Sequence, residues 1–461
     1  MYLELLQQIL SIVNRANDLN GNNIVEKIKG QIKERGLSTY EEWGRENFDI
    51  NYKFSNNNYY YGKEELILLH IGSLDNQKNV VNALLAAQGI DVNLQNQSQE
   101  TSLHLAIEKG NENIVKALLA AQGIDVNLKN RSQATPLHLA IKEGNENIVK
   151  ALLEVKGIYV NLQDNDKKTP LHLAIEKGNE NIVNALLAAQ GIYVNLQDND
   201  KKTPLHLAIE KGNEKIVKAL LKVKGIDVNL QDNDKKTPLH LAIEKGNENI
   251  VNALLAAQGI DVNLRDKSER TPLYLAAEKG KIEIVKAILD KNLSSINLPN
   301  KCGHTPLYIA AWEYHHKIVI ALLDKGADPL LDNRDNKTLD KELTEKAIMI
   351  AIILDVGIFI ITSIVAAIVV TSAYFIGVSL SVGAMAGIAV AAAVLTGLVA
   401  GGIIYEVLKP CDELKEAIAK AISKHSAVED SKPDCSLENP GTRLLASVKG
   451  FINKAKSFCV I

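Results

Sequence analysis

The sequence predicts an all-α fold: a solenoid of helix–turn–helix repeats, each with a hairpin loop, followed by a two-helix transmembrane hairpin and a short helical tail. Two observations carry this prediction. From position 67 the chain repeats with a period of about 34 residues, which is typical of stacked helical units. The segment from 347 to 405 holds one formal charge, Asp355, and a run of that length can cross a bilayer twice.

Composition excludes several classes of function. The 461 residues carry a net charge of −3 and an ordinary share of charged side chains, so no basic footprint for nucleic acid is present. The four cysteines lack the spacing of a zinc site or a disulfide framework. Because no phosphate loop or nucleophile motif occurs either, we expect no enzyme activity, cofactor or metal. The first residues lack the features of a signal peptide.

Residues 1–66 are expected to form a helical N-terminal cap. Apolar residues on one helical face predict a first helix over 5–13, and a second candidate runs from 24 to 33. An insertion rich in Asn and Tyr follows at 55–61. Because the end of a solenoid must be covered, we interpret this region as a cap on the first repeat. A separate functional domain is the alternative.

Residues 67–337 hold about eight repeats. In the copy that starts at Thr135, the threonine is placed to cap a helix and Pro136 occupies its first turn. Gly144 is placed to end that helix, and Asn145 to cap a second one. A single helical hairpin cannot bury its own apolar face, so neighbouring repeats must stack.

The repeated tetrapeptide threonine-proline-leucine-histidine resembles the ankyrin repeat. It stands in register at Thr135–His138, Thr169–His172, Thr203–His206 and Thr237–His240. The resemblance implies paired antiparallel helices with projecting hairpin loops, and a concave surface that binds other proteins.

The chain departs from the family at the loop turn, where the family usually has glycine two residues before the threonine. Polar residues occupy this position: Gln133, Lys167, Lys201, Lys235 and Glu269. A left-handed conformation at a residue other than glycine costs roughly 1–2 kcal/mol. We therefore expect either a different turn or an array less stable than one with glycine. The three lysines are also candidate protein-binding residues.

Six histidines recur in register, one per repeat: His70, His104, His138, His172, His206 and His240. One interpretation is a metal ladder or a pH sensor. The other is a structural histidine bonded to its own threonine and to neighbouring backbone, which we favour because metal ligands must converge on one point.

The last repeats carry most of the sequence variation. Tyr274 and Tyr308 replace the motif histidine, and Trp312, Tyr314 and His315 stand in a segment that is Glu-Lys-Gly-Asn-Glu in most copies. Exposed aromatic residues on a repeat surface are typical interaction anchors, so these five are candidate protein-binding residues. The alternative is that the last repeat packs against the hydrophobic segment or the tail.

A linker helix is expected at 338–355 and the transmembrane hairpin at 356–405. An acidic residue at the centre of a span is costly, so the first span is placed after Asp355, at 356–378, and the second at 384–405. Lysines flank both ends and none lies in the turn, which favours a two-pass membrane protein with both termini and the repeats on the cytoplasmic side. A hairpin buried in a soluble fold is the competing interpretation.

Small residues suggest how the hairpin packs. Gly383 with Gly387, and Gly397 with Gly401, have the GxxxG spacing that allows close helix packing and a homo-oligomer. Chance is the alternative in a glycine-rich run. The tail, 406–461, is expected to be cytoplasmic and helical. Its basic amphipathic segment at 442–458 suits either a membrane surface or the solenoid.

Two functions remain open. The first is a membrane-anchored scaffold for protein–protein interaction, with unidentified protein partners and the lipid bilayer. The whole chain resembles ankyrin-repeat proteins of obligate intracellular bacteria, which implies secretion into a host cell and an effector role on host proteins. The second is a membrane-active or pore-forming protein whose glycine-rich hairpin oligomerises, with the repeats as a targeting or regulatory module.

Overall fold

The computed structural model describes residues 2–36, 38–58, 62–313, 315–328 and 331. This part of the chain falls into two compact units, one ending at Asn233 and one beginning at Asp234. The linker helix, transmembrane hairpin and tail expected at 338–461 lie outside the described residues. Of the helices that are described, none is both long and apolar enough to span a bilayer.

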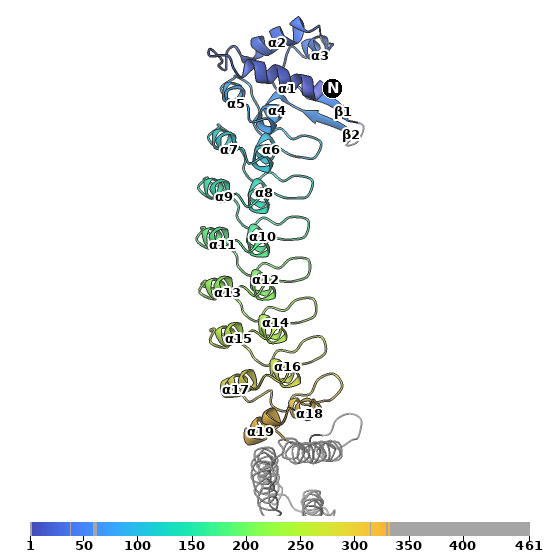
Figure 1. Cartoon of the computed structure of the whole chain (residues 1–461), viewed down its shortest axis with the longest axis vertical. Coiled ribbons are helices and arrows are strands. Elements are labelled where there is room, and N and C mark those ends of the chain that lie inside the picture. Colours follow the sequence, from blue (N-terminus) through green and yellow to red (C-terminus); the bar gives the residue numbers. More distant parts are fainter. Residues whose placement is uncertain (1, 37, 59–61, 314, 329–330, 332–461) are drawn as a thin grey trace, which may run out of the picture. The chain divides into compact units, whose positions relative to one another are not determined.

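The first unit opens with three helices and a two-stranded hairpin (Figure 1). These elements are α1 (Tyr2–Val13), α2 (Ile24–Glu34), α3 (Thr39–Arg45), β1 (Phe54–Asn58) and β2 (Gly62–Leu66). The strands are antiparallel, with Phe54 opposite Leu66. The helices predicted at 5–13 and 24–33 coincide with α1 and α2, whereas the predicted helical cap did not include this hairpin. The hairpin forms because its base is anchored by the buried side chains of Phe54 and Leu66.

An aromatic cluster holds these N-terminal elements together. Trp43 is fully buried, and its Nε1 donates to the carbonyl oxygen of Asp49 at 2.7 Å. Its ring meets Phe48 and Phe54 edge-on, with centroids 5.4 and 5.6 Å apart, which is a favoured aromatic geometry. Helix α3 and the base of the hairpin are therefore fixed to one core.

The N-terminal helices pack directly on the first helix pair of the same unit. Asn14 Oδ1, just after α1, accepts the backbone N–H groups of Asn79 and Val80 at 2.9 and 3.1 Å. These donors belong to the first turn of the helix Lys78–Leu85, whose N–H groups have no partner inside that helix. Asn14 thus caps a helix more than sixty residues away in sequence, which ties the N-terminal region to the repeats.

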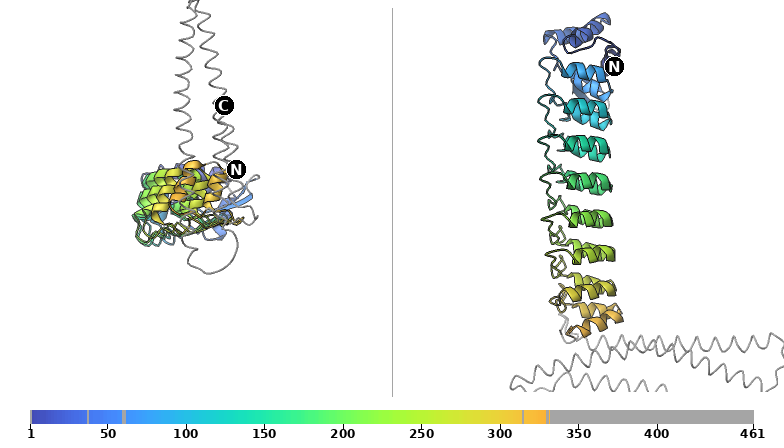
Figure 2. Two further views of the ribbon diagram at one scale, coloured as in Figure 1. Left: turned by 90° about the horizontal axis from the view of Figure 1, so that it is seen from below. Right: turned by 90° about the vertical axis from the view of Figure 1, so that its left-hand side faces the viewer.

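Helix pairs of similar length make up the rest of the described residues in both units. The first unit contains α4 (Leu68–Leu74) with α5 (Lys78–Leu85), α6 (Ser102–Glu108) with α7 (Glu112–Leu119), α8 (Pro136–Lys142) with α9 (Glu146–Leu153), α10 (Pro170–Lys177) with α11 (Glu180–Leu187), and α12 (Pro204–Glu210) with α13 (Glu214–Leu221). The second contains α14 (Pro238–Lys245) with α15 (Glu248–Leu255), α16 (Pro272–Glu278) with α17 (Ile282–Lys291), and α18 (Pro306–Trp312) with α19 (His316–Asp324). Within each unit the loops between pairs project along one side of the helices (Figure 1, Figure 2).

The stacking of pairs buries one apolar stripe on every helix. In the pair α10 and α11, Leu171, Ile175 and Leu186 are fully buried, and Val183 is 1% exposed. Equivalent residues are buried in the other pairs, because within each unit neighbouring pairs cover one another's stripe. Gly178, with φ of 70°, ends α10 in a left-handed conformation that allows the sharp turn into α11.

A ladder of asparagine side chains joins successive repeats of the first unit. Asn127 Oδ1 accepts the N–H of Tyr159 at 2.8 Å, and its Nδ2 donates to the carbonyl oxygen of Gly157 at 2.9 Å. Asn161 does the same for Tyr193 and Gly191 in the following repeat, at 2.8 and 2.7 Å. The ladder fixes the start of each loop relative to its neighbour, and it explains part of the high asparagine content.

Candidate functional site

The recurring histidines hold the repeats together. In the α10 repeat, His172 Nδ1 accepts the backbone N–H of Thr169 at 3.2 Å and lies 2.7 Å from its Oγ1. Its Nε2 lies 3.2 Å from the carbonyl oxygen of Lys202, in the next repeat. Because a carbonyl can only accept, the proton sits on Nε2 and the ring is neutral. Both nitrogens are used within the protein, so the structural interpretation is confirmed and a metal ladder is wrong.

Burial keeps these histidines neutral. Desolvation lowers the pKa of His70 and of His104 from 6.5 to about 4, although hydrogen bonds to backbone carbonyls partly oppose it. Desolvation is also the largest cause that lowers the pKa values of His138, His172 and His240. Their role is in the stability of the repeats, and their pH response stays a prediction.

The candidate lysines lie at exposed loop tips in a left-handed conformation. Lys167 and Lys201 in the first unit have φ of 56° and 57°, and Lys235 in the second has φ of 57°. The expectation of a different turn is therefore wrong: the turn keeps the conformation that favours glycine. A glutamine side chain stabilises it, because Gln163 Nε2 donates to the Lys167 carbonyl oxygen at 2.6 Å and to that of Gln197 at 3.0 Å.

A row of ion pairs runs along the first helices of the repeats. In the first unit Lys168 Nζ lies 2.8 Å from Glu176 Oε1, and Lys202 makes the equivalent contact with Glu210 at 2.8 Å. The side chains are about three-quarters buried. Burial alone would lower the pKa of Lys168, but the hydrogen bond and charge of Glu176 outweigh it and raise that pKa.

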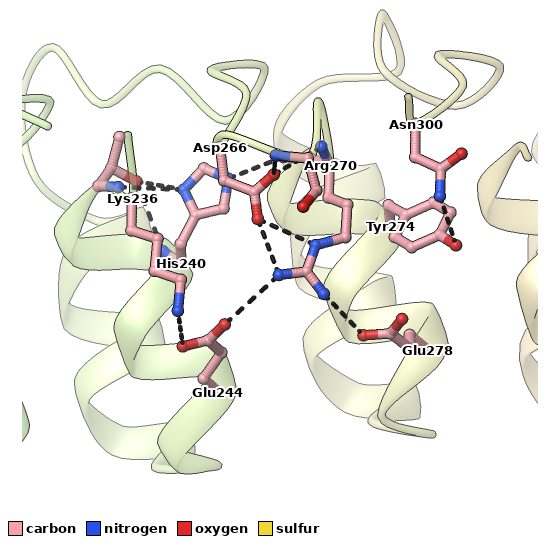
Figure 3. Close-up of polar contacts among 10 residues, drawn as sticks. Lys236, His240, Glu244, Asp266, Arg270, Tyr274, Glu278 and Asn300 are labelled. Carbon is pink, nitrogen blue, oxygen red and sulfur yellow. Dashed lines mark hydrogen bonds and ion pairs between the residues drawn. The ribbon is translucent and has the colours of Figure 1, made fainter. Parts of the chain in front are cut away.

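In the second unit the equivalent residues form a connected network around Arg270 (Figure 3). Its Nη2 lies 2.9 Å from Asp266 Oδ2 and 3.7 Å from Glu244 Oε1, and its Nη1 lies 3.3 Å from Glu278 Oε2. Lys236 Nζ contacts the other Glu244 oxygen at 2.9 Å. Basic and acidic side chains are therefore interleaved along this face, and each cation contacts at least one carboxylate.

In the last described repeat, aromatic residues occupy the two positions that form this ion pair in earlier repeats. His304 and Trp312 stand where the earlier copies have the basic and the acidic partner of the ion pair. The Tyr308 ring lies between them, with centroids 4.3 Å from His304 and 5.9 Å from Trp312, and both pairs are stacked. Trp312 is 43% exposed, whereas Tyr308 is buried. The row of ion pairs thus gives way to an aromatic stack whose outer member faces solvent.

Tyr274 is part of the core rather than an exposed anchor. Its side chain is 2% exposed, and its hydroxyl accepts from Asn300 Nδ2 at 3.0 Å (Figure 3). Desolvation raises the pKa of its phenol above the usual range. The prediction that Tyr274 is exposed for binding is wrong, because it fills the buried site that histidine occupies in other repeats.

His315 makes an inter-repeat contact. Its Nε2 lies 3.3 Å from the carbonyl oxygen of Glu278. A Cβ added to Gly280 would lie 2.6 Å from this ring, so the glycine provides the space for it. Tyr314 lies outside the described residues, as do Gly383, Gly387, Gly397 and Gly401, and their proposed roles stay predictions.

Two highly exposed aromatic residues of the first unit were not among the sequence-based candidates. Tyr159 and Tyr193 are each 63% exposed and stand at equivalent positions of adjacent repeats. The signal was present in the sequence, because both replace an aspartate that other copies keep, as at Asp125 and Asp227.

Among the residues that the structure describes, no group of three or more His, Cys, Asp or Glu side chains is placed to hold a metal ion.

Comparison with known proteins agrees with this geometry. A family model described as ankyrin repeats in three copies matches residues 68–164, 122–198, 190–266 and 258–333. Among solved structures, the ankyrin repeat domain of Bcl-3, described as a unique member of the IkappaB protein family, is 30% identical. That match covers 45% of this chain and 93% of the other, with a TM-score of 0.42, too low to add to the argument. Among curated proteins, none matches the chain.

The family matches together span residues 68–333, which is more than half of the 461 residues. They cover the helix pairs, the capped helix starts and the inter-repeat histidines described above. The chain therefore belongs to the ankyrin-repeat family, whose repeats suggest a protein–protein interaction module and whose members are typically non-enzymatic scaffolds.

Proposed function

We propose that this protein is a membrane-anchored interaction scaffold that binds a partner protein through the face around Trp312. The observation that carries the proposal is the change along this face from ion pairs to the stack of His304, Tyr308 and Trp312. Trp312 is 43% exposed, and tryptophan is among the residues that most often dominate binding energy at interfaces.

The surroundings of Trp312 suit an interface. The preceding repeat presents Arg270 and Glu278, which are paired at 3.3 Å and partly exposed. An aromatic centre beside a polar, hydrogen-bonding rim is the usual arrangement of protein interfaces. The stacked Tyr308 supports the indole from below, so little side-chain freedom is lost when a partner binds.

Membrane anchoring is supported by the sequence. The run from 347 to 405 with its single charge, Asp355, and the lysines on both flanks favour a hairpin with the repeats on the cytoplasmic side. The similar organisation of ankyrin-repeat proteins of obligate intracellular bacteria supports the further proposal that the partner is a host protein.

The binding proposal is tested by proximity labelling from the full chain in its native cell. Trp312→Ala is expected to reduce labelling of the specific partner at least tenfold, as loss of a hot-spot residue does. Leu293 is a matched control because its side chain is also 43% exposed in the same unit, so Leu293→Ala should leave labelling unchanged. Equal labelling by wild type and Trp312→Ala would show that this face is not the binding site.

The anchoring proposal is tested by deleting residues 347–405. The shortened chain should be released from membranes, while the full chain resists a carbonate wash. Protease added to the repeat side of sealed vesicles should remove the repeats, and their protection would contradict the orientation. Leakage of liposomes caused by the full chain would favour the pore-forming alternative instead.

A further inference from the structure

Tyr159 and Tyr193 form an exposed pair on adjacent repeats of the first unit. Each stands in the turn after the second helix of its repeat, α9 or α11, and each is 63% exposed. The next repeats on either side have Asp125 and Asp227 at the same position. The four side chains therefore form one column across four successive repeats, with two tyrosines in the middle and a carboxylate at each end.

The tyrosines do not take over the role of the aspartate they replace. Asp125 Oδ1 accepts the N–H of Asn127, two residues on, at 2.9 Å, and Asp227 does the same for Asn229 at 2.9 Å. A tyrosine cannot reach back to make this turn-stabilising bond. The backbone is nevertheless unchanged, because Tyr193 N–H donates to Asn161 Oδ1 at 2.8 Å as Asp227 N–H donates to Asn195 Oδ1 at 2.9 Å.

The spacing of the column suits one kind of extended ligand. Packed helices of neighbouring repeats lie about 8–10 Å apart. A polyproline II helix rises about 3.1 Å per residue with three residues per turn, so positions three apart lie on one edge about 9 Å apart. Alternate residues of a β-strand are only about 7 Å apart. Equivalent side chains on consecutive repeats are therefore expected at about the spacing of two prolines separated by two residues.

Charge adds a second requirement. The end positions of the column, Asp125 and Asp227, are exposed carboxylates, and each uses its Oδ1 in its own turn. They lie one repeat beyond the tyrosines, which is one further turn of a polyproline II ligand. Basic side chains three residues outside the two prolines would complement them.

We propose that the Tyr159–Tyr193 column binds a polyproline II segment of a partner protein, with two prolines three positions apart and a basic residue three positions outside each. Tyrosine rings pack on proline rings, as in aromatic-lined grooves that recognise such segments, and the aspartates pair with the basic ends. This inference rests on the proposed scaffold function and adds a second surface to it, away from Trp312 in the sequence.

The test uses the full chain and the fluorescently labelled peptide Arg-Ala-Ala-Pro-Ala-Ala-Pro-Ala-Ala-Arg, with binding followed by fluorescence anisotropy. We expect saturable binding that weakens at least tenfold in the double variant Tyr159→Asp with Tyr193→Asp. That variant restores the aspartate of the other repeats, so its thermal unfolding temperature should not fall. Tyr159→Ala with Tyr193→Ala is a second variant that removes the rings without adding charge, and it should also weaken binding at least tenfold.

Two further comparisons separate spacing from charge. The peptide Arg-Ala-Ala-Ala-Pro-Pro-Ala-Ala-Ala-Arg has the same composition but adjacent prolines, and it should bind at least tenfold more weakly. Asp125→Asn with Asp227→Asn keeps the turn-stabilising oxygen but removes the charge, and should weaken binding several-fold, an effect that added salt reproduces in the wild type.

Several results would overturn the inference: no binding of the first peptide, equal binding of both peptides, or equal binding to wild type and the double tyrosine variant. Tighter binding of a helical peptide with anchors seven residues apart, about 10.5 Å, would assign the column to a helical partner instead. Trp312→Ala should not affect peptide binding. If partner labelling still depends on Trp312 while the peptide fails to bind, the scaffold function stands and only this inference is lost.

Discussion

His138 Nε2 lies 3.1 Å from the carbonyl oxygen of Lys168, thirty residues further along the chain, and donates a hydrogen bond from one repeat to the next. The opposite nitrogen, Nδ1, accepts the N–H of Thr135 at 3.2 Å in its own repeat. Protonation would place a hydrogen on Nδ1 and remove that acceptor. The contact between these repeats therefore depends on a neutral imidazole.

Stability is expected to fall at mildly acidic pH. The folded pKa values of His70 and His104 are lowered to about 4 by burial, whereas in the unfolded chain they are about 6.5. The stabilisation is thus complete above pH 6.5 and is lost as the pH falls below it, because the unfolded state binds the protons first. Lowering the pH from 7.5 to 5.5 should cost about 1 kcal/mol for each of these two histidines.

The measurement is the free energy of unfolding of the full chain at both pH values, from guanidinium titrations followed by circular dichroism. His104→Gln should be less stable at pH 7.5 but should lose less stability on acidification, because one titrating group has been removed. A free energy that stays the same at pH 7.5 and 5.5 would contradict the neutral, buried state of these residues.

Glycine at the loop tips should stabilise the repeats. Lys167 and Lys201 hold φ of 56° and 57°, which costs roughly 1–2 kcal/mol for a residue with a Cβ. Glycine removes this cost, but it also makes the unfolded chain more flexible, which lowers the free energy of unfolding by roughly 0.4–1 kcal/mol. The double variant Lys167→Gly with Lys201→Gly should therefore be about 1 kcal/mol more stable, measured by the same guanidinium titration.

Lys150 provides a control, because glycine at this position should change stability in the opposite direction. It is an exposed residue within α9, where glycine lacks any conformational advantage. Lys150→Gly should destabilise the protein by about 1 kcal/mol. If both changes shift stability in the same direction, the left-handed strain assigned to the loop tips is wrong.

The regular period of the repeats and the capped helix starts were enough to predict the helix pairs and the bonding of His172. The N-terminal hairpin was not predictable in this way, because Phe54 is buried against Trp43 of α3 and Tyr52 of the segment before the strand, outside any periodic pattern. The site was predicted only in part. Tyr274 and Trp312 look alike in sequence as aromatic replacements, yet one is 2% and the other 43% exposed, and only packing between repeats decides which.

Arg270 should contribute more to the free energy of unfolding than the basic residues at the equivalent positions of other repeats. It contacts Asp266, whose side chain is 2% exposed, together with Glu244 and Glu278. Arg270→Met would leave a buried carboxylate with fewer donors, which we expect to cost about 2 kcal/mol, less than for a fully buried pair because Arg270 keeps some solvent contact. Thermal or guanidinium unfolding of the full chain measures this loss.

Lys202→Met is the matched variant in the first unit. Lys202 contacts the partly exposed Glu210 at 2.8 Å, and loss of such a pair typically costs less than about 1 kcal/mol. Arg270→Lys keeps the charge but not the forked geometry and should fall between the two. Equal losses for Arg270→Met and Lys202→Met would show that the network is no more than isolated pairs.

The asparagines of the ladder should contribute more to the free energy of unfolding than the asparagines of the loop tips. Asn161 makes two bonds to the next repeat, to Tyr193 N–H at 2.8 Å and to the Gly191 carbonyl oxygen at 2.7 Å, so Asn161→Ala should cost about 2 kcal/mol. Asn165 is exposed and makes a single long side-chain bond, 3.4 Å to Arg131, so Asn165→Ala should cost less than about 0.5 kcal/mol. Unfolding titrations distinguish the two. A similar small loss for both variants would mean that apolar stacking, and not the ladder, sets the register between repeats. The expected difference would also explain why the backbone of the turn is unchanged where tyrosine replaces aspartate.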